Sequence, residues 1–150
     1  LMGPVRELTA YTRTLTRRIE VEDSAVAICE FESGAVGTIE GSTTCYPGYP
    51  RRIEICGEAG SVVLEEDTLL SWDLPIPTSL PVGEGAKNVG SADPMAISGA
   101  GHELQIRNFV RAILYGEPIL AGAATGRLPL EIILGIYESS RTGRAVRLMP

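Results

Sequence analysis

The feature of this sequence that most restricts its fold is the order of its segments. Residues 5–74 hold short runs rich in strand-forming residues, whereas residues 101–142 carry apolar residues at helical spacing. Strands in one block followed by helices in another are typical of an α+β domain. We therefore expect a large open, mainly antiparallel sheet with two C-terminal helices packed on one face and the other face used for oligomerisation.

The strands are expected at residues 5–17, 24–31, 35–44, 51–57, 60–67 and 68–74, with a short last strand at 145–148. Ser33-Gly34 predicts a tight hairpin, because Gly34 can take a positive φ. One helix lies within residues 101–116, and the second begins at Thr125 as N-cap and ends at Gly143 as left-handed C-cap.

A single domain is expected for residues 1–150, a length that buries about 70% of the unfolded surface. Residues 74–100 are rich in proline and glycine, and a loop this long predicts a mobile excursion over one end of the sheet. The opening residues 1–4 are typical of a helix end followed by a strand, so we expect an excised fragment.

The strand at residues 24–31 is apolar on both sides. Ala25, Ala27 and Cys29 alternate with Val26 and Ile28, which predicts that both faces of the sheet are covered. Two helices can cover one face. We therefore expect a homodimer or tetramer that packs sheet face against sheet face.

Composition excludes several classes of protein. The net charge is −6, with one lysine and twelve arginines, which argues against binding to nucleic acid. The longest apolar stretch, residues 128–137, contains Glu131 and is too short to span a membrane. Cys29, Cys45 and Cys56 lack the spacing of a zinc site or a disulfide framework, so a reducing, cytoplasmic location is expected.

Few side chains suggest chemistry. His102, the only histidine, stands at the start of a helix, where it either contacts a ligand or lies on the surface. Tyr46 and Tyr49 lie in a connection between strands and either present hydroxyls to a sugar or polyol or belong to an ordinary turn. Cys45 with His102 would make the nucleophile and base of a thiol-dependent hydrolase, although nothing positions a third group.

The carboxylates Glu20, Glu22 and Asp23 precede a strand. They could supply acid and base or hold a metal, but without a second histidine a solvated turn is the better interpretation. No G-x-G-x-x-G stands between a strand and a helix, so a nucleotide-binding loop is not expected in this chain.

An ordered set of motifs, "RIEICGEAGS", "QIRNFVRAI" and "IYESSRTGRAV", resembles the C-terminal domain of the Gfo/Idh/MocA oxidoreductases, which include glucose–fructose oxidoreductase and inositol 2-dehydrogenase. The resemblance covers nearly the whole chain except residues 74–100. It implies a parent enzyme whose N-terminal Rossmann domain binds NAD or NADP, while this domain lines the site of a sugar or polyol substrate and makes oligomer contacts.

The resemblance assigns no catalytic, cofactor or metal residue to this chain. The family's E-K-P lysine has no counterpart, since Lys87 lies in the loop, and the D-x-x-x-H pair falls upstream of Leu1. Tyr49 and His102 match positions that face substrate, and Tyr46 and Arg51 are weaker substrate-binding candidates. The fragment is not expected to catalyse alone, and a non-catalytic binding or assembly domain is the alternative.

Overall fold

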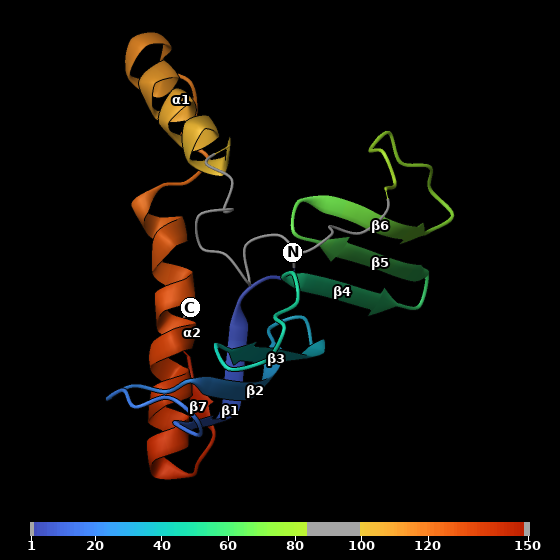
Figure 1. Cartoon of the computed structure of the whole chain (residues 1–150). Coiled ribbons are helices and arrows are strands. Elements are labelled where there is room, and N and C mark those ends of the chain that lie inside the picture. The colour runs from blue at the N-terminus through green and yellow to red at the C-terminus, as the bar shows by residue number, and fades with distance from the viewer. Residues whose placement is uncertain (1, 84–99, 149–150) are drawn as a thin grey trace. The chain divides into compact units, whose positions relative to one another are not determined.

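The computed structural model describes residues 2–83 and 100–148 (Figure 1). The chain divides into two compact units, one formed by residues 1–44 and 100–150 and the other by residues 45–99. We call them unit 1 and unit 2 and describe each by itself. The expected single domain and the mobility of loop 74–100 stay predictions, and residues 84–99 of that loop lie outside the described residues.

Unit 1 contains a four-stranded antiparallel sheet. Its strands are β1 (Val5–Arg13), β2 (Ser24–Phe31), β3 (Val36–Ser42) and β7 (Val146–Arg147), and they lie in the order β3-β2-β1-β7. The predicted hairpin between β2 and β3 is confirmed, with Gly34 at φ +85°. The N–H of Gly34 donates to the carbonyl of Phe31 at 2.9 Å, which fixes the register of the two strands.

Helix α2 (Ala123–Thr142) packs on one face of this sheet, along β1 (Figure 1). The buried core between them consists of Leu8, Ala10, Ala27, Cys29 and Ile136. Gly135 allows the close approach, because a Cβ at this position would lie 3.3 Å from Cδ2 of Leu8. Every second residue of β1 and of β2 therefore points toward α2 and forms the core, because side chains alternate between the two faces of a strand.

The ends of α2 agree only in part with the sequence. Gly143 is the left-handed C-cap as predicted, with φ 67° and its N–H donating to the carbonyl of Ser139. The predicted N-cap is wrong, because Gly122 caps the helix with extended backbone and Thr125 lies inside it. Ala123 and Ala124 are strong helix formers, and the Gly126 N–H donates to the Gly122 carbonyl, so the first turn extends upstream.

Two serines of α2 complete the edge of β1. Strand β7 pairs with β1 at Glu7 and Leu8, and further along β1 its N–H groups meet side chains instead. The Oγ of Ser139 accepts from the N–H of Ala10 at 2.9 Å, and the Oγ of Ser140 accepts from the N–H of Thr12 at 2.8 Å. Buried N–H groups are thus satisfied without a full-length neighbouring strand.

The sheet face opposite α2 is exposed and mixes apolar with polar side chains, since Thr38 pairs with Ile28 and Glu40 with Val26 on this face. Tyr11 pairs with Val26, and Thr9 pairs with Ile28 on the same face. Tyr11, Val26 and Ile28 are 63%, 49% and 61% exposed. Since a sheet with one helix layer leaves its second face in water, these side chains need another cover to be buried.

Unit 2 contains a three-stranded antiparallel meander, β4 (Arg52–Gly57), β5 (Gly60–Glu65) and β6 (Thr68–Asp73). Gly60, at the start of β5, has φ +141°. A Cβ there would lie 1.8 Å from the carbonyl oxygen of Asp73 at the end of β6, so only glycine fits this position. One face is apolar, since Ile55 pairs with Val62 and Val62 with Trp72. The indole N–H of Trp72 in β6 donates to the carbonyl of Ile76, which follows the strand, at 2.6 Å.

The α+β class, the antiparallel strands and the two C-terminal helices are confirmed. The strands form two sheets rather than one large sheet, because Pro47 and Pro50 interrupt residues 43–51, where a ladder between β3 and β4 would continue. The second difference concerns helix α1 (Ala100–Tyr115). The helix that packs on the four-stranded sheet is α2, and α1 contacts the connector that follows it.

Candidate functional site

The substrate-facing candidates divide between the two units. His102 is the third residue of α1, in unit 1, and its side chain is exposed. Tyr46, Tyr49 and Arg51 lie in unit 2, in the segment that leads into β4. The substrate-binding role of these residues and their assembly into one site stay predictions.

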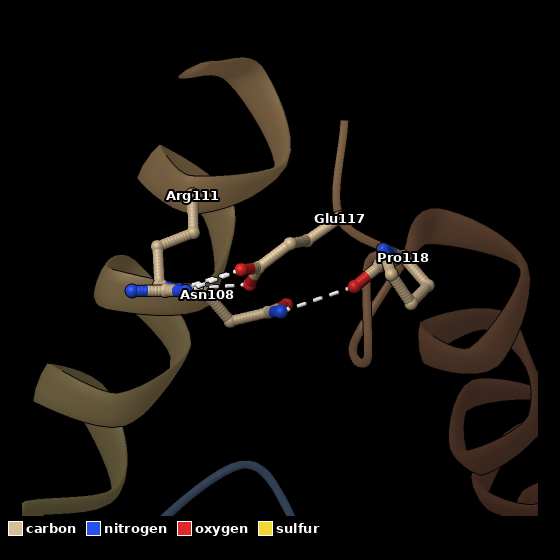
Figure 2. Close-up of polar contacts among 4 residues, drawn as sticks. All are labelled: Asn108, Arg111, Glu117 and Pro118. Atoms are coloured by element: carbon tan, nitrogen blue, oxygen red, sulfur yellow. Dashed lines mark hydrogen bonds and ion pairs between the residues drawn. The ribbon is translucent and has the colours of Figure 1, made fainter. Parts of the chain in front are cut away.

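Helix α1, which carries His102, is tied to the connector at residues 116–122. The Asn108 side chain donates to the carbonyl of Pro118 at 3.0 Å (Figure 2). It also accepts from the N–H of Leu120 at 3.0 Å. Arg111 forms a two-pronged ion pair with Glu117, with Nε 3.0 Å from Oε1 and 2.8 Å from Oε2. This pair lowers the pKa of Glu117 and raises that of Arg111. The C-terminal end of the helix is thus fixed to the connector.

Tyr46 and Tyr49 are open to solvent. Their side chains are 95% and 76% exposed, and between them Gly48 has φ +92°, which turns the chain sharply. Two exposed phenol groups on a short turn can donate and accept hydrogen bonds to a polyhydroxylated molecule. Their role in substrate binding stays a prediction.

Arg51 is engaged by the turn between β5 and β6. Its Nη2 lies 3.3 Å from Oδ1 of Asp67 and 3.5 Å from Oε2 of Glu66. Glu66 also accepts from the N–H of Arg51 at 2.8 Å, and its own N–H donates to the Arg51 carbonyl. Because its charge is already balanced, Arg51 is a weaker substrate ligand than the two tyrosines.

The interpretation of Asp23 as part of a solvated turn is wrong. Its side chain is 2% exposed, and its carboxylate accepts from the N–H groups of Leu15, Thr16 and Arg17 at 2.8–3.0 Å. The N–H groups of Arg17, Leu15 and Thr16 lower the pKa of Asp23 to about 2. Asp23 therefore organises the loop between β1 and β2 and is not free to act as an acid, base or metal ligand.

The neighbouring carboxylates differ from it. Glu20 is exposed, whereas Oε1 of Glu22 accepts from the hydroxyl of Tyr137 on α2 at 2.8 Å. That hydrogen bond raises the pKa of Tyr137. Within the described residues, no group of three His, Cys, Asp or Glu side chains is arranged to hold a metal ion.

No sequence pattern predicts the contact that Arg17 makes. Its guanidinium Nε lies 3.2 Å from the carbonyl oxygen and 3.1 Å from Oγ1 of Thr43, just beyond the end of β3. The contact joins residues 26 positions apart. No spacing rule links a loop arginine to a distant threonine, so only the fold reveals the pair.

The cysteines have distinct environments. Cys29 is fully buried, and burial raises the pKa of its thiol, which makes it a poor nucleophile. Cys45 is exposed and belongs to unit 2, whereas His102 belongs to unit 1. The described residues thus provide no additional support for a thiol-dependent hydrolase. None of the described helices has the length and apolar character to cross a membrane.

Residues 1–63 match the family model of the GFO/IDH/MocA C-terminal domain. No curated protein matches the chain significantly in sequence. Among solved structures, the chain is similar to the WlbA dehydrogenase from Chromobacterium violaceum in complex with NADH and UDP-GlcNAcA. The sequence identity is 29% and the TM-score is 0.79. The match covers 99% of this chain and 41% of that chain. The WlbA dehydrogenase from Bordetella pertussis, with the same ligands, is 28% identical, with a TM-score of 0.78, and the match covers 100% and 42% of the two chains.

A more distant structure shares the fold. Levoglucosan dehydrogenase in complex with NADH and L-sorbose is 19% identical, with a TM-score of 0.75, and the match covers 98% of this chain and 45% of that one. The chain therefore spans less than half the length of the structures that it matches. These findings confirm the resemblance to the C-terminal domain of this family.

Proposed function

Since the chain matches the C-terminal domain of the Gfo/Idh/MocA oxidoreductases, we propose that it is the substrate-binding and oligomerisation domain of an NAD(P)-dependent oxidoreductase acting on a hydroxyl of a sugar or polyol. The observation that carries the proposal is the likeness to two dehydrogenases that hold NADH and a nucleotide sugar, over 99% and 100% of this chain. The proposed location is the cytoplasm.

The cofactor would be bound elsewhere in a longer protein. Dinucleotide sites are built on parallel strands joined by helices, whereas the strand pairs within both described sheets are antiparallel. The described residues therefore do not fit a dinucleotide. We propose that the site for NAD or NADP, and the family's catalytic lysine, belong to the remainder of a longer chain; the matched WlbA structure is more than twice as long as this chain.

This chain's part is to recognise and orient the substrate. The hydroxyls of Tyr49 and Tyr46 can donate to and accept from substrate hydroxyls, and the imidazole of His102 can do the same from the start of α1. Such groups select which hydroxyl-bearing carbon is presented for oxidation. His102 is assigned an orienting role, and none of these residues is assigned the catalytic proton transfer.

Oligomerisation is proposed through the exposed face of the four-stranded sheet. This face exposes four apolar side chains beside Thr38 and Glu40: Tyr11, Val26, Ile28 and Val36, with exposed fractions from 49% to 75%. A second copy of the same face would bury it by two-fold symmetry. A domain that kept this face and lost its catalytic partner would be a binding or assembly module, which is the alternative function.

The first experiment is the intact mass of the protein as its own cell produces it, followed by an assay of the purified protein. We expect a product longer by a domain of on the order of 100–150 residues, which reduces NAD+ or NADP+ with one of a panel of sugars, polyols and nucleotide sugars. Tyr49→Phe and His102→Ala should each raise KM by about 3- to 10-fold, the effect of one lost hydrogen bond.

Tyr115→Phe is the matched control, because Tyr115 is also an exposed tyrosine, 69% exposed, and lies at the far end of α1. It should leave KM unchanged. A product that ends with these 150 residues and reduces no cofactor would contradict the enzyme function and favour the assembly module.

A further inference from the structure

The side of the four-stranded sheet that α2 does not cover, which we call the open face, carries opposite charges at its two ends. β1 crosses this face with Glu7 at one end and Arg13 at the other. Both side chains lie on the open face, because side chains alternate along a strand and the neighbouring Leu8 and Ala10 belong to the core. The two charges are about 20 Å apart along the strand, too far for an ion pair within one chain.

At the Arg13 end, an arginine stacks on a tyrosine. Cζ of Arg13 lies 5.7 Å from the centroid of the Tyr11 ring, within the range of a cation–π contact. Tyr11 is 63% exposed. Among the described side chains, no carboxylate lies within ion-pair distance of Arg13. The exposed pair therefore carries a positive charge that a partner can use.

At the Glu7 end, the open face is hollowed. A shallow cavity of about 220 Å³ is lined on this face by Glu7, Thr9, Ile28, Glu30 and Val36. The two carboxylates are its only charged groups, and Arg6 binds that of Glu30. Within the described residues Glu7 forms no ion pair, although Arg147 is its neighbour on β7. The hollow thus offers one carboxylate to a cation from outside the chain.

We propose that the open face binds a second copy of itself with the strands of the two copies antiparallel. The Tyr11–Arg13 pair of each copy then enters the hollow of the other, and Arg13 forms an ion pair with Glu7 of the partner subunit. Two-fold symmetry makes each contact twice. The inference rests on the oligomerisation role in the proposed function, and it adds the orientation and the contacts of the two copies.

The charges select this orientation. Sheets that pack face to face lie about 10 Å apart with their strands nearly aligned, so the two-fold axis runs either across the strands or along them. An axis across β1 at Ala10 brings Arg13 over Glu7 of the partner subunit, because the two residues lie equally far on either side of Ala10. An axis along the strands brings equivalent ends together. It would place Glu7 close to the same residue or to Glu30 of the partner subunit, and like charges at an interface are costly.

The test exchanges the two charges and measures the dissociation constant of the dimer by ultracentrifugation of the full-length protein. Arg13→Glu and Glu7→Arg should each weaken the dimer by at least about 10-fold, because each converts two attractions into two repulsions. The double variant should restore the dissociation constant to within about 3-fold of the original value. Since the two residues are too far apart to pair within one chain, a contact between copies explains such a rescue.

The matched control is Arg18→Glu, which makes the same change of charge at an exposed arginine in the loop after β1. It should leave the dissociation constant unchanged. Circular dichroism of every variant checks that the chain is folded.

Cross-linking tests the orientation without reversing a charge. Arg13→Cys and Glu7→Cys are made in separate tagged proteins in which the exposed cysteines, Cys45 and Cys56, are replaced by serine. The proteins are mixed at a concentration at which both are dimeric. A bismaleimide that spans about 10 Å should link an Arg13→Cys chain to a Glu7→Cys chain, and not to another Arg13→Cys chain.

Linkage between two Arg13→Cys chains overturns the proposal, and so does a double variant that dissociates as readily as the single ones. A monomeric original protein contradicts the oligomerisation role itself. A dimer that is lost in Ile28→Glu and is not rescued by the charge exchange contradicts the orientation alone.

Discussion

A carboxylate that accepts three backbone N–H groups is more easily ionised than one in water, because only the charged form accepts all three bonds well. Asp23 is such a group, and its pKa is lowered to about 2 by the N–H groups of Arg17, Leu15 and Thr16. Its free energy of ionisation is therefore linked to the free energy of unfolding.

The expected consequence is a loss of stability in acid. The pKa of Asp23 falls from an ordinary 3.8 to about 2 on folding, so its contribution is fully present above pH 4 and is lost as pH falls through 2. Asp23→Asn should remove it, and the urea midpoint of the variant should then depend less on pH between 4 and 2. Circular dichroism at each pH measures the midpoints.

Glu20→Gln is the control for this comparison, since it removes a nearby carboxylate that is exposed. It should leave the acid dependence of the urea midpoint close to that of the original protein. Equal pH dependence in the original protein and Asp23→Asn would contradict the assignment of these three hydrogen bonds.

At this scale the sequence could predict residue types but not partners. Val26 and Ile28 were placed correctly on one face of their strand by alternation alone. The burial of Asp23 and the grip of Arg17 on Thr43 depend on the path of a loop, which follows no periodic rule. The same limit applies to Arg51, whose charge is balanced by a turn 15 residues further on.

Among the elements, helix α2 contains two interior glycines with opposite surroundings. A Cβ at Gly126 would meet no atom within 4 Å, whereas a Cβ at Gly135 would lie 2.8 Å from Cδ2 of Leu148 and 3.3 Å from Cδ2 of the buried Leu8. The same substitution should therefore act in opposite directions in one helix.

Gly126→Ala should raise the free energy of unfolding by about 0.5–1 kcal/mol, because alanine restricts the unfolded chain and favours helix. Gly135→Ala should lower it by about 1 kcal/mol, since overpacking against β1 and β7 outweighs that gain. Urea unfolding of the two variants side by side measures the difference. A stabilised Gly135→Ala would mean that α2 packs less tightly on the sheet than described.

The sequence located the elements well and their ends less well. All six main strands and both helices lie where alternation and helical spacing predict them. The start of α2 was misplaced because a cap residue such as Thr125 is a local signal, whereas the helix continues upstream through Ala123. Pro129 then lies inside the helix, where it lacks the N–H that would donate to the carbonyl of Thr125.

For the whole molecule, the exposed face of the four-stranded sheet is the feature that predicts behaviour in solution. Light scattering of the purified protein should give at least a dimer. Ile28→Glu should weaken the dimer by at least about 100-fold, because two-fold symmetry introduces the charge twice into an apolar contact. Leu15→Glu, at an exposed loop position, is the control and should leave the dimer intact.

A monomeric original protein would contradict this prediction, and so would an Ile28→Glu variant that stays dimeric. The prediction comes from the two-sided apolar pattern of β2 in the sequence. The division into two sheets was not predicted, although Pro47 and Pro50 in the connection between β3 and β4 are sequence signals for a break in the ladder.

The two serines on α2 affect how the protein aggregates at high concentration. An unpaired strand edge is a template on which foreign strands grow into fibrils. Along β1 the hydroxyls of Ser139 and Ser140 occupy the N–H groups that such a strand would use. The short strand β7 and the two serine side chains thus protect this edge of the sheet against edge-to-edge polymerisation.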